Sequence, residues 1–186
     1  MKDYLAALDK LRDNNRLFAC PCSRKELAAG KHQYGCLQRK VPLNAENVAW
    51  RINTRDLAPV NIPDLVQSDN FIIDLHETMP DFVVRKKDGR PSYQPACVVD
   101  DVLFGINTVG RGQDLLPSTA AQALLSRLMG FGDLFDRIQF LHHPLIAGQG
   151  GEKLSKSAGA EGVSELGTSF EHQELVSLVR AWLKRN

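Results

Sequence analysis

Apolar positions recur at helical spacing in three stretches of the chain. Residues 2–16 and 170–184 each carry apolar side chains three and four positions apart, which is typical of helices that pack one face on a core. The clearest helix begins at Pro117-Ser118-Thr119, whose hydroxyls offer an N-terminal cap, and Gly130 is its stop signal. The apolar residues that define these faces are Tyr4, Leu5, Leu8 and Leu11; Ala123, Leu124 and Leu128; and Leu175, Leu178, Val179 and Trp182.

Short apolar runs between these helices predict strands at residues 49–52, 71–75, 82–85 and 138–141. Residues 86–90 are predicted to form a solvent-facing turn, because Asp88-Gly89 is a favoured hairpin pair. The segment 96–106 is apolar enough to be buried, although Asp100-Asp101 interrupts it. We interpret these two aspartates as residues that orient the region, without a catalytic role.

The composition is that of an ordinary globular protein. Of the 186 residues, 43% are hydrophobic and 24% are charged, which suits one domain or one and a half. A net charge of +1 provides no general attraction to nucleic acid or membrane, so any RNA contact has to come from a local basic patch. Neither a long apolar run nor a signal-peptide pattern is present, so we expect a cytoplasmic protein whose four cysteines are thiols or metal ligands.

Three cysteines and a histidine lie close together near the N-terminus. Cys20, Cys22, His32 and Cys36 have the residue types that close a tetrahedral zinc site, and a small segment with little core gains folding energy from such a metal. Cys-x-Cys is, however, a less usual spacing than Cys-x-x-Cys. The spacing alone therefore leaves two interpretations, a zinc site or three reduced thiols in a compact knuckle.

A glycine-rich loop at residues 148–157 follows the last predicted strand. Its glycines free the backbone to approach a ligand, and Lys153 and Lys156 supply mobile cationic donors that suit phosphate. Such a pair can stabilise the charge that builds up when a triphosphate releases pyrophosphate. The loop is not a Walker A motif, because the Gly-Lys-Ser/Thr ending is absent. Without further context, a solvated surface loop is the alternative interpretation.

The amino-acid sequence of this loop points to a known family. Lys153-Leu154-Ser155-Lys156-Ser157 resembles the KMSKS signature of class I aminoacyl-tRNA synthetases. Several upstream segments resemble, in order and spacing, the second half of the glutamyl-tRNA synthetase catalytic domain; they are 81–94, 98–101, 105–106, 111–116, 118–119 and His142 before Pro144-Leu145. The short tail after the signature is most similar to the glutamyl-queuosine tRNA(Asp) type of this family.

The resemblance implies an α/β fold, namely the second half of a Rossmann-like class I synthetase catalytic domain with a small zinc-binding acceptor-stem insertion. Residues 1–78 would hold the N-terminal helix and the zinc knuckle. Residues 79–158 would form the half-Rossmann part that ends in the signature loop, and residues 159–186 a helical tail. No string like His-x-Gly-His, the family's other signature, occurs in this sequence. We therefore expect it to encode about half of a glutamate-activating site.

The resemblance implies that the loop binds ATP and takes part in its reaction. Lys153 and Lys156 are expected to act in catalysis by stabilising the leaving pyrophosphate, in a reaction that depends on Mg²⁺. Ser155 and Lys156, together with His142, are expected to contact the nucleotide. Where the family usually has an arginine this chain has Ala121, a departure that we expect to weaken a phosphate or tRNA contact.

Glutamate recognition falls to Tyr93 and Arg111 by the same resemblance. A guanidinium pairs two ways with a carboxylate, which is how a site tells glutamate from glutamine. On composition alone, a surface ion pair is the more usual role for such an arginine. For the metal the resemblance favours zinc, with His32 at the position of a family tyrosine and Tyr34 as the lesser candidate for the fourth ligand.

By resemblance, the complete enzyme joins L-glutamate and ATP into glutamyl-adenylate and passes glutamate to the acceptor stem of a tRNA, without a membrane partner. Two alternatives stay open: a non-catalytic paralogue that binds tRNA or nucleotide, and one half of a split enzyme completed by another chain. Because the other half would cover part of a parallel sheet, we expect a homo-oligomer or a complex with a partner chain.

Overall fold

The computed structural model describes residues 1–29, 35–65, 70–145 and residue 180. In these ranges the helices are α1 (Lys2–Arg12), α2 (Arg24–Ala28), α3 (Gly35–Gln38), α4 (Leu75–Thr78), α5 (Tyr93–Leu103), η1 (Gln113–Leu115, a 3-10 turn), α6 (Leu116–Leu128) and α7 (Gly132–Phe135). The strands are β1 (Leu17–Cys20), β2 (Ala49–Ile52), β3 (Val60–Ile62), β4 (Phe71–Ile73), β5 (Val83–Arg85), β6 (Thr108–Gly112) and β7 (Gln139–His143). Within this described part, no helix is both long enough and apolar enough to cross a bilayer.

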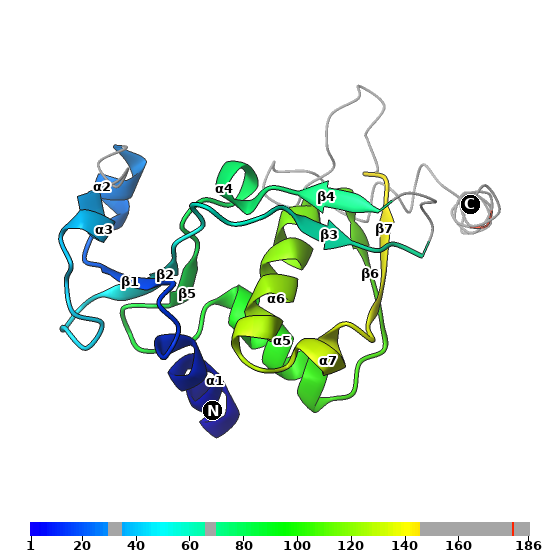
Figure 1. Ribbon diagram of the computed structural model, residues 1–186, viewed down its shortest axis with the longest axis horizontal. Coiled ribbons are helices and arrows are strands. Elements are labelled where there is room, and N and C mark those ends of the chain that lie inside the picture. Colours follow the sequence, from blue (N-terminus) through cyan, green and yellow to red (C-terminus); the bar gives the residue numbers. More distant parts are fainter. Residues whose placement is uncertain (30–34, 66–69, 146–179, 181–186) are drawn as a thin grey trace, which may run out of the picture.

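One end of the molecule is built on a three-stranded antiparallel sheet in the order β1-β2-β5 (Figure 1). After β1, Ser23 begins α2 with a capping box: its hydroxyl accepts from the backbone N–H of Glu26, and the Glu26 carboxylate accepts from the backbone N–H of Ser23. The cap fixes the direction in which the chain leaves the sheet. Helix α3 then returns to pack beside β1.

A parallel pair of strands, β6 and β7, forms the other end of the molecule (Figure 1). Helices α5 and α6 lie between this pair and the antiparallel sheet, and the β3–β4 hairpin packs on α6. Helix α1 packs on α5, where the Tyr4 hydroxyl donates a hydrogen bond to the Asp100 carboxylate. Asp100 therefore joins two helices, in agreement with the orienting role predicted for it.

In the described part of the chain, a large hydrophobic core joins the two ends. Its most deeply buried members include Leu11 of α1, Ile52 of β2, Val98 of α5, Leu125 of α6 and Phe135 of α7. Burial of each side chain of this size contributes roughly 1.5–3 kcal/mol. The cysteines of the antiparallel end, with Phe18, form a second and smaller buried cluster.

Two predicted elements end earlier than their apolar pattern suggests. In both cases a polar side chain forms hydrogen bonds with backbone groups near the end of the element. Helix α1 ends at Arg12 because the side-chain amide of Asn14 donates to backbone carbonyls of α1 and α6, at 3.2 and 3.1 Å. Strand β4 ends at Ile73 because the Asp74 carboxylate accepts from the first backbone N–H groups of α4.

The prediction that a side-chain hydroxyl caps the start of α6 is wrong. Leu115 stands at the cap position and no side chain caps the helix, since the Thr119 hydroxyl bonds to a buried histidine instead. The segment 96–106, predicted to be buried, belongs mostly to α5, which begins earlier, at Tyr93. Val98 and Val99 are buried, but the prediction is wrong for the end of the segment, where Phe104 is 73% exposed. The helix predicted over residues 170–184 lies outside the described residues except for Arg180, which is helical.

Candidate functional site

Arg111 and His142, two of the predicted site residues, are direct partners on the parallel strands β6 and β7. Paired residues of neighbouring parallel strands share a face of the sheet, and here that face is covered by α6. Arg111 lies near the carboxyl end of β6, where ligands bind in open α/β sheets. At Gly112 the backbone passes so close to Asp114 that a Cβ would lie 2.5 Å from its carboxylate oxygen.

The Arg111 guanidinium is held by neutral groups. Its Nη1 donates to the side-chain oxygen of Gln122 at 3.0 Å, and its central carbon lies 5.3 Å from the centre of the Phe140 ring. Among the described residues, no carboxylate approaches it within ion-pair distance. The guanidinium thus keeps its charge and most of its donors for another acceptor.

Tyr93, Cys97 and Asp101 are spaced four residues apart on α5 and lie close to Arg111. A hydrogen bond with Cys97, followed by burial, raises the pKa of Tyr93. Burial raises the pKa of Cys97 and of Asp101. The positive charge of Arg111 opposes all three shifts, which shows that these side chains share one neighbourhood. Tyr93 is 61% exposed, so its phenol is accessible to a ligand.

Behind Arg111 runs a chain of buried side-chain hydrogen bonds that the sequence did not suggest. Gln122 Nε2 donates to Gln94 Oε1 at 2.9 Å, and Gln94 Nε2 donates to Ser118 Oγ at 3.0 Å. The available signal was weak: Ser118 and Gln122 are polar residues about one turn apart on a helix that is otherwise mostly apolar. Nothing in the local sequence connected them with Arg111.

His142 is completely buried. Its Nδ1 lies 2.7 Å from the Asp64 carboxylate, which also accepts from the His142 backbone N–H, and its Nε2 lies 2.9 Å from the Thr119 hydroxyl. Burial lowers the pKa of His142, although the hydrogen bond and the charge of Asp64 act in the opposite direction. A contact of His142 with a nucleotide stays a prediction, since its ring is enclosed by protein groups in the described structure.

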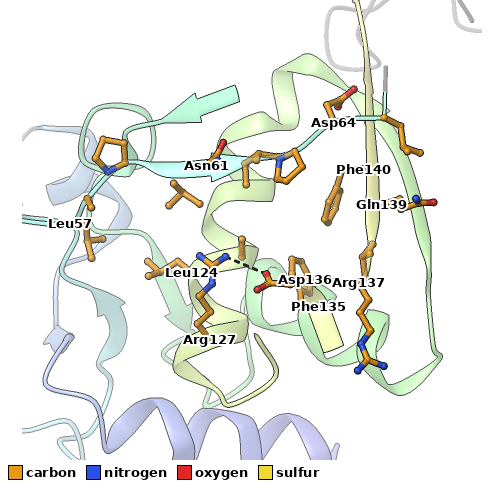
Figure 2. Close-up of a pocket in the computed structure, with 18 residues that line it drawn as sticks. Leu57, Asn61, Asp64, Leu124, Arg127, Phe135, Asp136, Arg137, Gln139 and Phe140 are labelled. Carbon is orange, nitrogen blue, oxygen red and sulfur yellow. Dashed lines mark hydrogen bonds and ion pairs between the residues drawn. The ribbon is translucent and has the colours of Figure 1, made fainter. Parts of the chain in front are cut away.

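A cavity of about 950 Å³ lies beside this region, between the β3 segment, α6 and the start of β7 (Figure 2). Leu57, Leu124 and Phe135 give it an apolar floor, and a 3.2 Å ion pair between Arg127 and Asp136 stands at its side. Tyr93, Arg111 and His142 do not line it. These three predicted site residues therefore lie outside this hollow.

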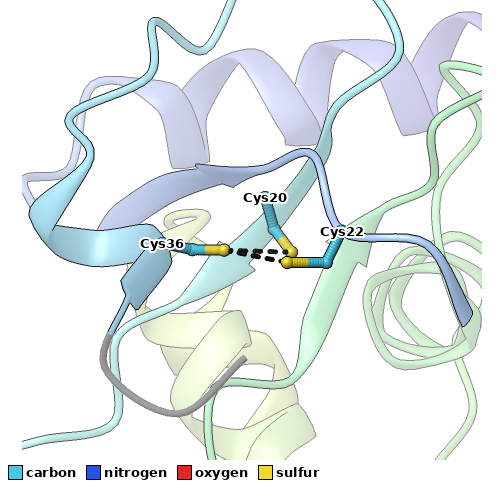
Figure 3. Close-up of side chains that lie close together, drawn as sticks. All are labelled: Cys20, Cys22 and Cys36. Carbon is cyan, nitrogen blue, oxygen red and sulfur yellow. Dashed lines mark hydrogen bonds between the residues drawn. The ribbon is translucent and has the colours of Figure 1, made fainter. Parts of the chain in front are cut away.

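The three predicted metal ligands with described positions come together. Cys20, Cys22 and Cys36 are buried, and Figure 3 shows their sulphurs converging from β1, from the segment that follows β1 and from α3. The Cys36 sulphur lies 3.2 Å from that of Cys22 and 3.8 Å from that of Cys20. Burial and the two neighbouring thiols raise the pKa of Cys36 to about 12. His32 and Tyr34, the candidates for a fourth ligand, lie outside the described residues.

The predicted turn at 86–90 is confirmed and supports this cluster. Gly89 has a φ of +84°, and the backbone N–H of Lys86 donates to the Arg90 carbonyl at 2.8 Å. From the turn, the Lys87 ammonium donates to the Pro21 carbonyl at 2.6 Å. Pro21 stands between the first two cysteines, so Lys87 helps to hold them in place. Lys153, Ser155 and Lys156 of the signature loop lie outside the described residues.

Comparison with known proteins identifies the family. Residues 7–169 match the family described as tRNA synthetases class I (E and Q), catalytic domain. The chain belongs to this family. Its α/β architecture is accordingly that of a class I synthetase catalytic domain, as the signature-loop resemblance predicted.

Two curated relatives of this synthetase-family chain are both glutamyl-Q tRNA(Asp) synthetases. That of Dechloromonas aromatica (strain RCB) is 37% identical over 170 residues, which cover 87% of this chain and 54% of the relative. That of Methylococcus capsulatus (strain ATCC 33009 / NCIMB 11132 / Bath) is 38% identical over 164 residues, covering 87% and 52%. The chain thus spans about half the length of the curated relatives it matches.

Solved structures agree on the fold. The crystal structure of glutamate-tRNA synthetase from Elizabethkingia anophelis matches with a TM-score of 0.66 at 23% identity, over 85% of this chain and 36% of that one. A glutamate tRNA ligase from Elizabethkingia meningosepticum CCUG26117, solved in complex with its amino acid, matches with a TM-score of 0.66 at 24% identity, over 85% and 35%. At this identity the likeness shows the fold alone.

Proposed function

We propose that this chain supplies the glutamate-binding side of an ATP-dependent glutamate–tRNA ligase site. In this proposal it forms the second half of the Rossmann-like catalytic domain. The observation that carries the proposal is the state of Arg111, a half-buried cation without an ion-pair partner among the described residues. Family membership and the position of Arg111 at a strand end support the same assignment.

The chemistry around Arg111 suits the side-chain carboxylate of L-glutamate. A partly desolvated guanidinium gains most from a planar anion that accepts two parallel hydrogen bonds. Its Nη1 is already bound to Gln122, which leaves the other donors for such a ligand. The exposed phenol of Tyr93 lies in the same neighbourhood and offers a second hydrogen bond. Arg111 and Tyr93 together would hold the amino acid.

The signature loop would act on ATP. Lys153 and Lys156 are proposed to stabilise the pyrophosphate as it leaves, with Mg²⁺ bound to the phosphates, and Ser155 to contact the nucleotide. His142 is proposed to support the nucleotide side of the site as the buried residue that pairs with Arg111 on the neighbouring strand. These assignments rest on the resemblance of the loop and on family membership.

The cysteine cluster fits a structural zinc ion. Sulphurs bound tetrahedrally about 2.3 Å from zinc lie about 3.8 Å from one another. The Cys20–Cys36 separation of 3.8 Å matches this spacing, and the Cys22–Cys36 separation of 3.2 Å needs only a small opening. Cys20, Cys22 and Cys36 are proposed as ligands, with His32 or Tyr34 as the fourth. Zinc would supply folding energy to the knuckle, which we propose to face a tRNA acceptor stem.

A second candidate is one half of a split enzyme, completed by a partner chain or by a second copy. Among the described strands β6 pairs only with β7, which leaves its outer edge open. Nearby, at the end of α5, Leu103 is 58% exposed and Phe104 is 73% exposed. An open strand edge beside apolar side chains is a surface that another chain can cover.

Calorimetric titration of the chain with L-glutamate tests the proposed function. We expect Arg111→Met to weaken glutamate binding by about tenfold or more, because a charge-assisted contact is lost. Arg137→Met removes an exposed arginine between α7 and β7 and serves as the matched control. Equal glutamate affinity in wild type and Arg111→Met would rule out the assignment of Arg111.

A further inference from the structure

The amide groups behind Arg111 can be oriented in only one way. An arginine donates hydrogen bonds and accepts none, so the group of Gln122 that faces it must be the carbonyl oxygen. The Gln122 amide nitrogen then faces Gln94, whose oxygen accepts and whose own nitrogen is left to donate to Ser118. The order Ser118–Gln94–Gln122–Arg111 is therefore a relay with a fixed direction, which we call the amide relay.

The amide relay is rigid for reasons of burial. Gln122 is fully buried, and Gln94 and Ser118 are 9% and 8% exposed. Breaking any link would leave a buried amide group without a partner, which is costly in a low-dielectric interior. The two glutamines also come from different helices, α5 and α6, so the relay is fixed by the packing of both.

Because the last link reaches Arg111, this rigidity passes to the guanidinium. Nη1 is tied to Gln122, and the flat group lies over the Phe140 ring. Both contacts are neutral, so the plane of the guanidinium is set without cancelling its charge. A carboxylate at position 122 would set the same plane but would occupy the cation.

We propose that Gln122, supported by Gln94 and Ser118, is a positioning residue that gives the site its preference for glutamate over glutamine. A fixed guanidinium donates to both oxygens of a carboxylate, but it presents an N–H donor to the amide nitrogen of glutamine, which cannot accept. A mobile one can turn away or admit water, and then penalises glutamine less. This inference rests on the proposed function of Arg111.

Two variants and a control test the inference in the whole chain. Gln122→Met keeps the size of the side chain and removes the link. Gln122→Glu keeps an acceptor for Arg111, adds a charge and removes the amide group that donates to Gln94. Ser126→Ala alters another buried polar residue of α6, whose hydroxyl bonds to the Ala123 carbonyl and not to the relay. For each we would measure L-glutamate and L-glutamine binding by calorimetry, and the mobility of the Arg111 Nε–H by ¹⁵N NMR relaxation without ligand.

We expect Gln122→Met to make the Arg111 Nε–H more mobile and to reduce the glutamate-to-glutamine affinity ratio by about tenfold. Gln122→Glu should weaken glutamate binding by a similar factor and leave glutamine binding nearly unchanged. Ser126→Ala should change neither property. An Arg111 signal in Gln122→Met as rigid as in Ser126→Ala overturns the positioning role, and so does an unchanged affinity ratio.

Failure of the proposed function has a different signature. If the wild type binds neither amino acid, Arg111 is not a glutamate site and the specificity role falls with it, whatever the NMR relaxation shows. If Gln122→Met does not fold, Gln122→Glu decides, since it retains the hydrogen bond to Arg111. Unchanged glutamate binding in Gln122→Glu overturns the inference.

Discussion

Asp64 and His142 lie 78 positions apart in the sequence, yet the Asp64 carboxylate and the His142 Nδ1 are 2.7 Å apart and both side chains are completely buried. A carboxylate accepts, so Nδ1 carries a proton, and the remaining nitrogen faces the Thr119 hydroxyl. Burial lowers the pKa of this histidine, which favours a neutral imidazole beside Arg111 on the neighbouring strand. A protonated His142 would place a second positive charge beside the guanidinium.

We predict that the chain loses stability as the pH falls below the ordinary histidine pKa of 6.5. Burial lowers the pKa of His142 in the folded state, with Arg111 acting in the same direction and Asp64 against it. Between the lowered value and 6.5 the unfolded chain binds more protons than the folded chain. The free energy of unfolding should therefore fall as the pH passes down through this window, and be restored above it.

Urea denaturation at several values between about pH 7.5 and about pH 5.5 measures this dependence. His142→Gln should be less stable at neutral pH but should lose the part of the slope that belongs to His142. His143→Gln is the matched control, because it removes the neighbouring histidine, whose Nδ1 lies 2.8 Å from the Pro144 carbonyl oxygen, and leaves His142 in place. A slope in His142→Gln equal to that of wild type would contradict the assignment.

Replacing Asp64 should destabilise the fold, and the loss of stability should be larger when the new side chain accepts fewer hydrogen bonds from His142. Asp64→Ala leaves the Nδ1–H and the backbone N–H of His142 without their partner, at a cost of about 1–3 kcal/mol for each buried group. Asp64→Asn keeps one acceptor and should cost less. Asp136→Asn changes an aspartate whose side chain is 53% exposed, and should stay within about 0.5 kcal/mol of wild type. Chemical denaturation at neutral pH gives the ranking, and an Asp64→Ala variant as stable as Asp136→Asn would refute it.

The sequence predicted those parts of this fold that a local pattern of residues determines. The strand at 49–52 and the turn at 86–90 were predicted from apolar runs and an Asp-Gly pair. Strand β6 was not, because Gly110 and Gly112 are poor strand residues and its pairing with β7 is what stabilises it. Helix α5 was obscured by Pro95, which is tolerated because it stands in the first turn.

The candidate site likewise contains residues that the local sequence predicted and residues that it did not. Arg111 and Tyr93 were predicted because they stand inside a recognisable string, and the cysteines because they are close in sequence. Asp64 and Gln122 were missed because their roles arise only from long-range packing, which joins segments without a shared local signal. The residues proposed to touch a ligand stand in a motif, whereas the residues that hold them in place are visible only in the folded structure.

For the signature loop we predict unequal roles for its two lysines. In the resembled family the second lysine lies nearest the phosphates, so Lys156→Ala should weaken ATP binding by about 10- to 150-fold, as expected for a lost charge-assisted contact of about 1.5–3 kcal/mol. Lys153→Ala should cost less, because the resemblance implies a position farther from the phosphates for the first lysine, where water would screen more of the attraction. Calorimetry with ATP and Mg²⁺ compares the two. If ATP binds to wild type and equally well to Lys156→Ala, the loop has lost its nucleotide function.

The cysteine cluster should hold about one zinc ion per chain. Three buried sulphurs that lie within 4.8 Å of one another form most of a tetrahedral ligand set, and a metal would separate and stabilise them as thiolates. Elemental analysis should find the ion in wild type and much less in Cys22→Ser, and a chelator should lower the melting temperature of wild type. Cys97→Ser is the matched control, since Cys97 lies on α5 beside Tyr93 and outside the cluster. Equal zinc in the two variants would place the metal elsewhere, and no zinc in wild type would leave three reduced thiols packed around Phe18 as the correct interpretation.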